Sequence, residues 1–258
     1  MEIKIKQSKL MEILDYLYID GIFPSSIITT KDGSLFSVQH DEDNFCFRYE
    51  QFYPEYFENI SKEQESVRID VQKVKGFASL RKADDIITLQ FPSPQSENKL
   101  LISSKRARNN IAVTKIDADD VSTSLPFMLK EKVPYINKGQ TPLDTHASIS
   151  LGSLKTLKEY ASKHSSDYYR FKIDANRKFE IIVGDINEHE DFTSFEPNAQ
   201  VCTVNEDLDV TFTKGIKELA KTCTGDVDVY MRTNMPAWFT EVSQKHKFGL
   251  FISPMRSE

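Results

Sequence analysis

The sequence predicts an α+β fold made of two copies of one domain, in which helices pack on antiparallel sheets. Three observations support this prediction. Most apolar runs are short and alternate with polar residues, which is the period of a half-buried strand. Only four segments have helical periodicity, and the order of strands and helices recurs after about 141 residues. The 258 residues are 39% hydrophobic, which is enough to bury a core in each half.

The first half begins with the alternating run EIKIK (2–6), which predicts a strand. A helix follows over 7–18, because Leu10, Ile13, Leu14 and Leu17 share one helical face. A second helix is expected over 72–82. Further strands are expected at 25–30, 34–39, 44–50, 66–71, 85–91, 99–105 and 109–116. This half therefore has the order strand, helix, three strands, strand, helix, three strands.

The second half has the same order. Helices are expected over 152–164 and 213–223, and strands at 147–151, 168–174, 178–185, 199–204, 207–212, 226–233, 238–244 and 248–254. In one pair of segments, the repeat is also visible as similar amino acids at matching positions. Val67, Ile69, Val71, Lys73, Asp85, Ile86 and Thr88 match Leu208, Val210, Phe212, Lys214, Asp226, Val227 and Val229 at the same offset. Duplication explains the shared order better than a chance likeness of two amphipathic segments.

A connector separates the halves at residues 117–146, so the expected domains are 1–116 and 147–258. It starts with acidic residues and contains three prolines, which fix φ and remove backbone donors. Its apolar patch, LPFML (125–129), is unusual for a linker surrounded by solvent.

The chain has a formal net charge of −6, but its positive charge is concentrated on three helices. The helical segments 72–82, 152–163 and 213–223 together carry +8. The lysines that point away from the apolar stripes, or flank them, are Lys75, Lys82, Lys155, Lys158, Lys163, Lys214, Lys217 and Lys221. Such faces can simply be solvated. At equivalent places in a duplicated chain, they predict one lysine surface that holds phosphates independently of sequence.

The first helix differs from the other three. Its outward positions include Ser8, Glu12 and Asp15, which would not attract phosphate. Either this helix lies away from the nucleic acid or the surface is unevenly charged.

Several functions have no support in the sequence. There is no phosphate-binding glycine loop, no HExxH, no CxxC and no GxSxG, so we expect no cofactor, no metal and no enzymatic activity. Acidic turns with a histidine, such as 40–43 and 188–191, are more typical of solvated loops than of metal sites. Three scattered cysteines favour a reducing, intracellular compartment. No apolar stretch has the length of a membrane span, and no secretory leader is evident.

Three segments resemble the sliding clamps of the PCNA family (proliferating cell nuclear antigen and its archaeal relatives). They are DDIITLQF (84–91), the terminal FGLFISPM (248–255) and DADDVSTSLP (117–126), which is similar to the family's interdomain connecting loop. The resemblance implies that each half is one clamp domain, with two helices facing the centre of a ring. Three subunits would close that ring around duplex DNA, and the lysines named above would line its channel.

The resemblance also implies two further sites. Partners of the family dock a short motif with a glutamine and aromatic residues beneath the connecting loop. Leu125 and Pro126 would form the roof of this pocket, Pro236 a wall, and Phe251, Ile252, Ser253 and Pro254 the floor. Ring closure would pair the strands at 109–116 and 178–185 of neighbouring subunits, through Ile111, Val113, Ile181 and Val183.

The expected function is that of a processivity factor without enzymatic activity. It would tether DNA polymerase to double-stranded DNA and would also bind a clamp loader, a flap nuclease and a ligase. In an archaeon this would happen in the cytoplasm or nucleoid, and in a eukaryote in the nucleus. Two alternatives are a subunit of a heterotrimeric checkpoint or repair clamp, and a DNA-modifying enzyme with an unrecognised site.

Overall fold

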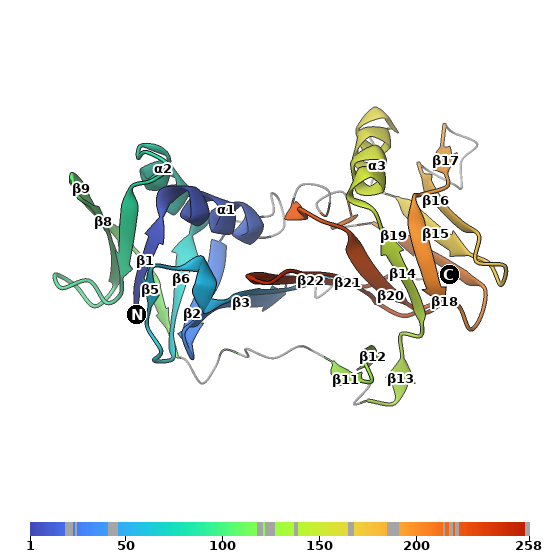
Figure 1. Ribbon diagram of the computed structural model, residues 1–258, viewed down its shortest axis with the longest axis horizontal. Coiled ribbons are helices and arrows are strands. Elements are labelled where there is room, and N and C mark those ends of the chain that lie inside the picture. Colours follow the sequence, from blue (N-terminus) through green and yellow to red (C-terminus); the bar gives the residue numbers. More distant parts are fainter. Residues whose placement is uncertain are drawn as a thin grey trace. The chain divides into compact units, whose positions relative to one another are not determined.

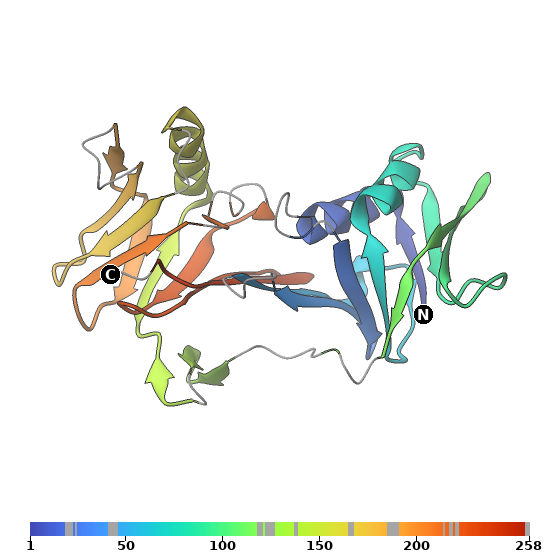
Figure 2. The same ribbon diagram turned by 180° about the vertical axis from the view of Figure 1, so that it is seen from behind.

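The computed structural model describes the chain except for residues 19–22, 24, 41–45, 118–120, 122–126, 137–138, 165–167, 185–190, 214, 217–218, 220–221 and 256–258. The chain forms two compact units. Unit 1 comprises Met1–Gln39, Arg48–Ser124 and Val242–Phe248, and unit 2 comprises His40–Phe47, Leu125–Glu241 and Gly249–Glu258. Each unit combines antiparallel sheets with helices (Figures 1 and 2), which confirms the predicted α+β class.

Unit 1 contains two sheets. The first has the order β5-β1-β7-β8-β9, with β5 (Asn59–Ile60), β1 (Glu2–Lys6), β7 (Ile86–Gln90), β8 (Lys99–Ser104) and β9 (Ala107–Ala112). The second has the order β10-β6-β2-β3-β4-β22, with β10 (Thr114–Ile116), β6 (Glu65–Asp70), β2 (Ser25–Lys31), β3 (Ser34–His40), β4 (Cys46–Phe52) and β22 (His246–Ile252). The short helix η1 (Pro54–Tyr56) follows β4. Ile3 and Ile5 of β1 are buried opposite Leu89 and Ile87, so a shift of register by one residue would expose both.

The helices α1 (Gln7–Leu17) and α2 (Val71–Ser79) of unit 1 pack against each other, as Figure 1 shows. The apolar stripe predicted for α1 is buried, and so are Val74 and Phe77 of α2. Gln7 Nε2 donates a hydrogen bond to the carbonyl of Ala78 at 3.1 Å. Asp70 caps α2, because its side chain accepts from the backbone N–H of Lys73 at 3.1 Å.

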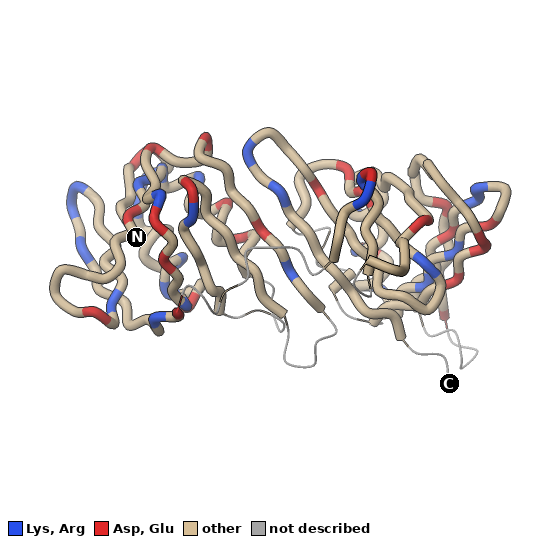
Figure 3. The backbone as a smooth tube through the Cα atoms, turned by 90° about the horizontal axis from the view of Figure 1, so that it is seen from below, with Lys and Arg blue, Asp and Glu red and all other residues tan. Residues whose placement is uncertain are grey.

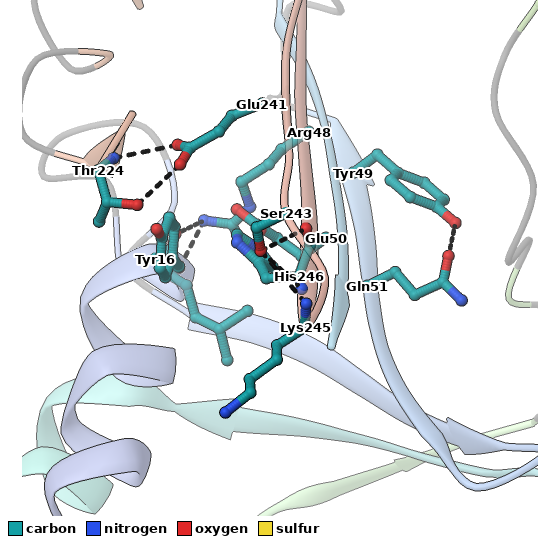
Figure 4. A network of polar contacts seen from close by, with 11 residues as sticks. Tyr16, Arg48, Tyr49, Glu50, Gln51, Thr224, Glu241, Ser243, Lys245 and His246 are labelled. Carbon is teal, nitrogen blue, oxygen red and sulfur yellow. Dashed lines mark hydrogen bonds and ion pairs between the residues drawn. The ribbon is translucent and has the colours of Figure 1, made fainter. Parts of the chain in front are cut away.

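Two buried polar groups support the strands of unit 1 (Figure 4). The guanidinium of Arg48 is fully buried and donates to the carbonyl of Leu17 at 2.5 Å and to Ser26 Oγ at 3.0 Å, which satisfies the end of α1. His246 Nε2 lies 2.6 Å from Glu50 Oε2, which joins the start of β22 to β4. Both polar groups therefore hold β4 at the place where β22 pairs with it.

Unit 2 contains two large sheets and one small sheet. The first has the order β22-β21-β20-β14-β18, with β21 (Ala237–Val242), β20 (Val227–Met231), β14 (Thr145–Ile149) and β18 (Ala199–Thr203). The second has the order β17-β16-β15-β19, with β17 (Thr193–Phe195), β16 (Phe179–Val183), β15 (Tyr169–Ile173) and β19 (Leu208–Phe212). Helix α3 (Leu151–His164) follows β14, and Leu154, Leu157 and Ala161 form its buried stripe.

The strand orders confirm the internal duplication. In chain order, β14, β20, β21 and β22 of unit 2 occupy the places of β1, β7, β8 and β9 of unit 1. The order β18-β14-β20-β21-β22 therefore repeats β5-β1-β7-β8-β9, and β19-β15-β16-β17 repeats β6-β2-β3-β4. A shared strand order in two sheets is a stronger sign of duplication than the seven sequence matches.

Two predicted elements are wrong in their extent. The strand expected at 109–116 is two strands, because the backbone N–H of Val113 donates to Asn98 O at 3.1 Å and the chain then leaves β8 to pair with β6. The helix expected over 72–82 ends at Ser79. Beyond it, the carbonyls of Ala83 and Asp85 accept hydrogen bonds from the first N–H groups of α1, which a continued helix could not provide.

The connector is more ordered than the prolines predicted. Part of it forms the small sheet of β11 (Met128–Lys130), β12 (Val133–Ile136) and β13 (Thr141–Pro142). Pro134 and Pro142 lie within these short strands. The sheet buries Ile136, which a fully extended linker would leave in water.

Candidate functional site

The lysine face of α3 has the clearest charge pattern. Lys155 and Lys163 are exposed and Lys158 is half-buried, opposite the apolar stripe of the helix. Lys163 Nζ lies 5.5 Å from the centre of the Tyr160 ring. Among the residues that the structure describes, none of these three lysines forms an ion pair. Their charges are therefore available to an external anion.

The lysine of α2 is in a different situation. Lys75 Nζ lies 2.5 Å from Asp15 Oδ1 of α1, and the side chain of Lys75 is only 32% exposed. On α1, Lys9 Nζ contacts Glu12 Oε2 at 2.7 Å. The outward acids expected on the first helix thus neutralise basic groups of their own unit. Figure 3 shows acidic residues interspersed with basic ones in this unit.

The electrostatics of Glu12 reflect this pairing. Burial alone would raise the pKa of its carboxyl group, but the hydrogen bonds and charge of Lys9, together with Tyr56, hold that pKa below its ordinary value. Glu12 is therefore ionised at neutral pH, and α1 offers no unpaired positive site beside it.

None of the remaining predicted lysines lies on a helix that the structure describes. Lys82 is exposed but lies in the turn after α2, where its N–H donates to Asp85 Oδ2 at 3.1 Å, so its helical placement was wrong. Lys214, Lys217 and Lys221 lie outside the described residues. The described neighbours Ile216, Leu219 and Cys223 are buried, as expected for the inner face of that segment.

Three aromatic rings of unit 2 form a cluster near the end of the chain. The Phe127 ring lies 4.8 Å from Trp238, edge to face, and 5.9 Å from Phe251. Trp238 is 2% exposed and Phe127 is 8% exposed, whereas Phe251 is half-buried. The sequence analysis assigned neither Phe127 nor Trp238 to the docking pocket. The apolar patch at 125–129 was the signal that could have identified Phe127.

The predicted docking pocket is brought together only in part. Pro236, Ser253 and Pro254 are half-buried, as Phe251 is, and have surface to offer. Ile252 does not, because neighbouring residues of a strand point to opposite faces and its side chain is 1% exposed in the core. Leu125 and Pro126 lie outside the described residues.

The strands expected to join subunits also need a correction. β9 is an edge strand, with Ile111 buried at 6% exposure and Val113 half-buried just beyond the strand. β16 is not an edge strand, because Ile181 and Val183 pair with Phe195 and Thr193 of β17. The edge strand next to β16 is β17, a strand of three residues that the sequence analysis did not identify.

The chain matches no family model and no curated protein. Solved structures, however, match it over nearly its whole length. PCNA from Entamoeba histolytica is 12% identical, with a TM-score of 0.75 over 99% of this chain and 98% of that one. PCNA of A. fulgidus, solved with the C-terminal region of FEN-1 bound, is 17% identical, with a TM-score of 0.70 over 100% and 99%. PCNA from Thermococcus kodakaraensis is 13% identical, with a TM-score of 0.69 over 98% and 99%.

The chain has the fold of the PCNA sliding clamps. The match covers both units, so the resemblance drawn from three short segments is confirmed as a likeness of fold. It also explains why each unit has the same pair of strand orders. At 12–17% identity, the PCNA-like fold places the elements but does not assign roles to individual side chains.

Two further findings concern other kinds of site. Within the described ranges, no helix of this PCNA-like chain is both long and apolar enough to cross a membrane. Within the same ranges, no three of the side chains His, Cys, Asp and Glu gather closely enough to hold a metal ion.

Proposed function

We propose that this chain is a subunit of a DNA sliding clamp, a protein without catalysis that encircles duplex DNA and tethers polymerase to it. The observation that carries the proposal is the lysine face of α3, whose three charges have no acidic partner among the described residues, on a chain with the PCNA fold. Lysine is a flexible point charge, so such a face suits weak contacts to phosphates of any sequence. Weak contacts allow sliding, whereas the ring provides retention.

The duplication supports assembly of the chain with copies of itself. In the sheet order, β22 lies next to β4. In the duplicated strand order, β9 in the first half of the chain corresponds to β22 in the second half, and β17 in the second half corresponds to β4 in the first. The pairing of β4 with β22 therefore has a counterpart that one chain cannot complete, between β9 of one copy and β17 of the next. Both strands are edges that need a partner.

The charges around these edges are complementary. Arg106 and Arg108 are exposed at β9, and Asp191 is exposed beside β17, whereas Glu196 already forms an ion pair with Lys178 at 3.0 Å. Phe192, next to β17, is 59% exposed, so its ring is available to pack against another copy. We propose that β9 and β17 of successive copies pair, and that three copies close a ring.

Partner proteins would dock on unit 2. Pro236, Phe251, Ser253 and Pro254 provide a partly apolar surface beside Trp238, which suits a short peptide with an aromatic anchor. The A. fulgidus PCNA structure contains the C-terminal region of FEN-1, which supports a flap nuclease among the partners. By the same reasoning we propose that polymerase, ligase and the clamp loader use this surface.

The DNA assignment is tested by replacing Lys155, Lys158 and Lys163 with alanine. Because each phosphate contact contributes about 0.9 to the slope of log affinity against log salt, the triple variant should lose about that amount for each contacting lysine. Fluorescence anisotropy with a labelled duplex at several salt concentrations gives this slope, and light scattering shows whether assembly is kept.

The matched control replaces three lysines that lie outside the helices, namely Lys4, Lys62 and Lys172, and should bind like the wild type. Lys75→Ala should have a smaller effect than Lys155→Ala, because Asp15 already neutralises Lys75. A triple variant with unchanged slope would remove α3 from the DNA interface.

A further inference from the structure

We propose that the chain's own Phe127 occupies the aromatic floor of the docking surface, and that an aromatic-anchored peptide binds by taking the place of the Phe127 ring. This inference rests on the proposed function, because it concerns the same docking surface. Phe127 would then control how readily a partner peptide reaches Trp238 and Phe251.

The contacts show how completely the ring covers the floor. The ring centres of Phe127 and Trp238 lie 4.8 Å apart in an edge-to-face arrangement, and the Phe127 ring lies 5.9 Å from that of Phe251. Only 8% of Phe127 remains exposed. This is the geometry in which a phenylalanine of an external peptide would be anchored. One aromatic side chain thus already fills the place that a second one would need.

The floor itself is fixed. Trp238 packs directly over the backbone of Gly249, where an added Cβ would lie 1.8 Å from Cη2 of the indole. Gly249 therefore lets β22 pass beneath the indole, and Trp238 cannot move in that direction. An aromatic ring of a peptide that approaches Trp238 would then have to displace the Phe127 ring, because Trp238 cannot move toward Gly249.

The connector around Phe127 is only partly anchored. Met128 and Leu129, which follow it in β11, are 53% and 51% exposed, so Phe127 is the buried side chain of this stretch. The turn between β11 and β12 has positive φ at Glu131 (50°) and Lys132 (72°), which is unfavourable for residues with a Cβ. The small sheet has contacts that do not involve Phe127, such as the hydrogen bond from Lys130 Nζ to the carbonyl of Gly139 at 2.7 Å, so release of the Phe127 ring would leave them in place.

Competition between the Phe127 ring and a peptide for the same position changes the apparent affinity for the peptide. A peptide binds only the fraction of molecules in which the floor is open, so its apparent affinity is lowered by that fraction. Removal of the competing ring should raise the affinity. We expect Phe127→Ala to bind the peptide about tenfold more tightly, which corresponds to about 1.4 kcal/mol at 25 °C. Phe127→Leu should lie between the wild type and Phe127→Ala.

The test uses the full chain and a short synthetic peptide with one glutamine and two adjacent phenylalanines, measured by calorimetry. A peptide with alanines in place of the phenylalanines is the ligand control, and Leu129→Ala is the matched protein control because it changes an exposed neighbour. Tighter binding to Phe127→Ala alone supports the proposal. Weaker binding to that variant would make Phe127 a wall of the site and would overturn it.

A second measurement separates this inference from the proposed function. Trp238 is the one tryptophan of the chain, so its fluorescence reports directly on the cover that Phe127 provides. In the free protein, Phe127→Ala should shift the emission to longer wavelength and increase quenching by acrylamide. Emission and quenching equal to the wild type would overturn the covering contact itself. If the fluorescence responds as expected but no variant binds the peptide, the docking function has failed and the displacement with it.

Discussion

At the scale of single residues, charge pairing decides which lysines are available for the proposed contact with DNA. Lys155 and Lys75 both occupy outward helical positions, and the sequence periodicity predicted both of them. Only the structure shows that Asp15 lies 2.5 Å from Lys75, because the two residues are 60 positions apart and come together when α1 packs on α2. Helical periodicity identifies the face of a helix, but it does not identify what the neighbouring helix places beside that face.

Glu12 provides a pH test of the acidic face of α1. Its pKa is lowered below its ordinary value of 4.5, so its ionised form contributes stability that is present above that value and lost as the pH falls through the folded pKa. We expect the urea midpoint of the wild type to fall more steeply than that of Glu12→Gln between about pH 5 and about pH 3. Parallel profiles of the two proteins would show that the Glu12–Lys9 pair does not contribute to folding.

The docking residues show a second limit of sequence reasoning. Strand alternation correctly implies that Phe251 and Ile252 face opposite ways, yet the family resemblance assigned both to one floor. Burial of Ile252 at 1% shows that alternation was the better guide. Phe127 was visible in the sequence as part of an apolar patch, but its contact with Trp238 joins residues more than 100 positions apart, and no local pattern encodes that.

At the scale of elements, the long periodic segments were predictable and the short strands were not. The prediction of α1 and α3 was correct to within a residue or so, because each carries a complete apolar stripe. β17 was missed because three residues cannot establish a period. The family resemblance placed the expected subunit edge on β16, but Ile181 and Val183 of that strand are already paired with β17. The error was therefore one of sheet order and not of secondary structure.

The proposed contact at the edge strand β17 can be tested with a substitution beside that strand. Replacing Phe192 with aspartate puts a charge where we propose that β9 of another copy packs. Because Phe192 is 59% exposed, the change should leave the stability of a single chain within about 0.5 kcal/mol, as for most surface substitutions. Light scattering should then give the mass of one chain. The control Leu80→Asp also changes an exposed apolar residue, one at 74% exposure, and should leave the assembly intact.

At the scale of the whole molecule, the duplication and the pairing of β4 with β22 together predict how copies of the chain would assemble. Each chain contains two repeats and one completed pairing of β4 with β22, and its described edge strands include β9 and β17, which correspond to β22 and β4 in the repeat. Joining β9 to β17 is a head-to-tail contact, which produces either a closed ring or an open filament. A ring of three chains would contain six repeats joined by the same kind of pairing throughout, and no edge strand of this kind would remain open. A net charge of −6 fits such an assembly if the positive charge faces inward and the acids face the solvent.

The assembly state of the isolated chain tests this rule. A closed ring of identical copies should have about three times the 29.7 kDa mass of one chain and should keep that mass as the concentration rises. A filament would instead grow with concentration, because each added chain leaves a new edge. A chain that stays single at all concentrations, with Phe192 intact, would indicate that its edges fit different subunits, as in a heterotrimeric clamp. Native mass spectrometry over a hundredfold range of concentration distinguishes the three outcomes, and Phe192→Asp provides the single-chain reference.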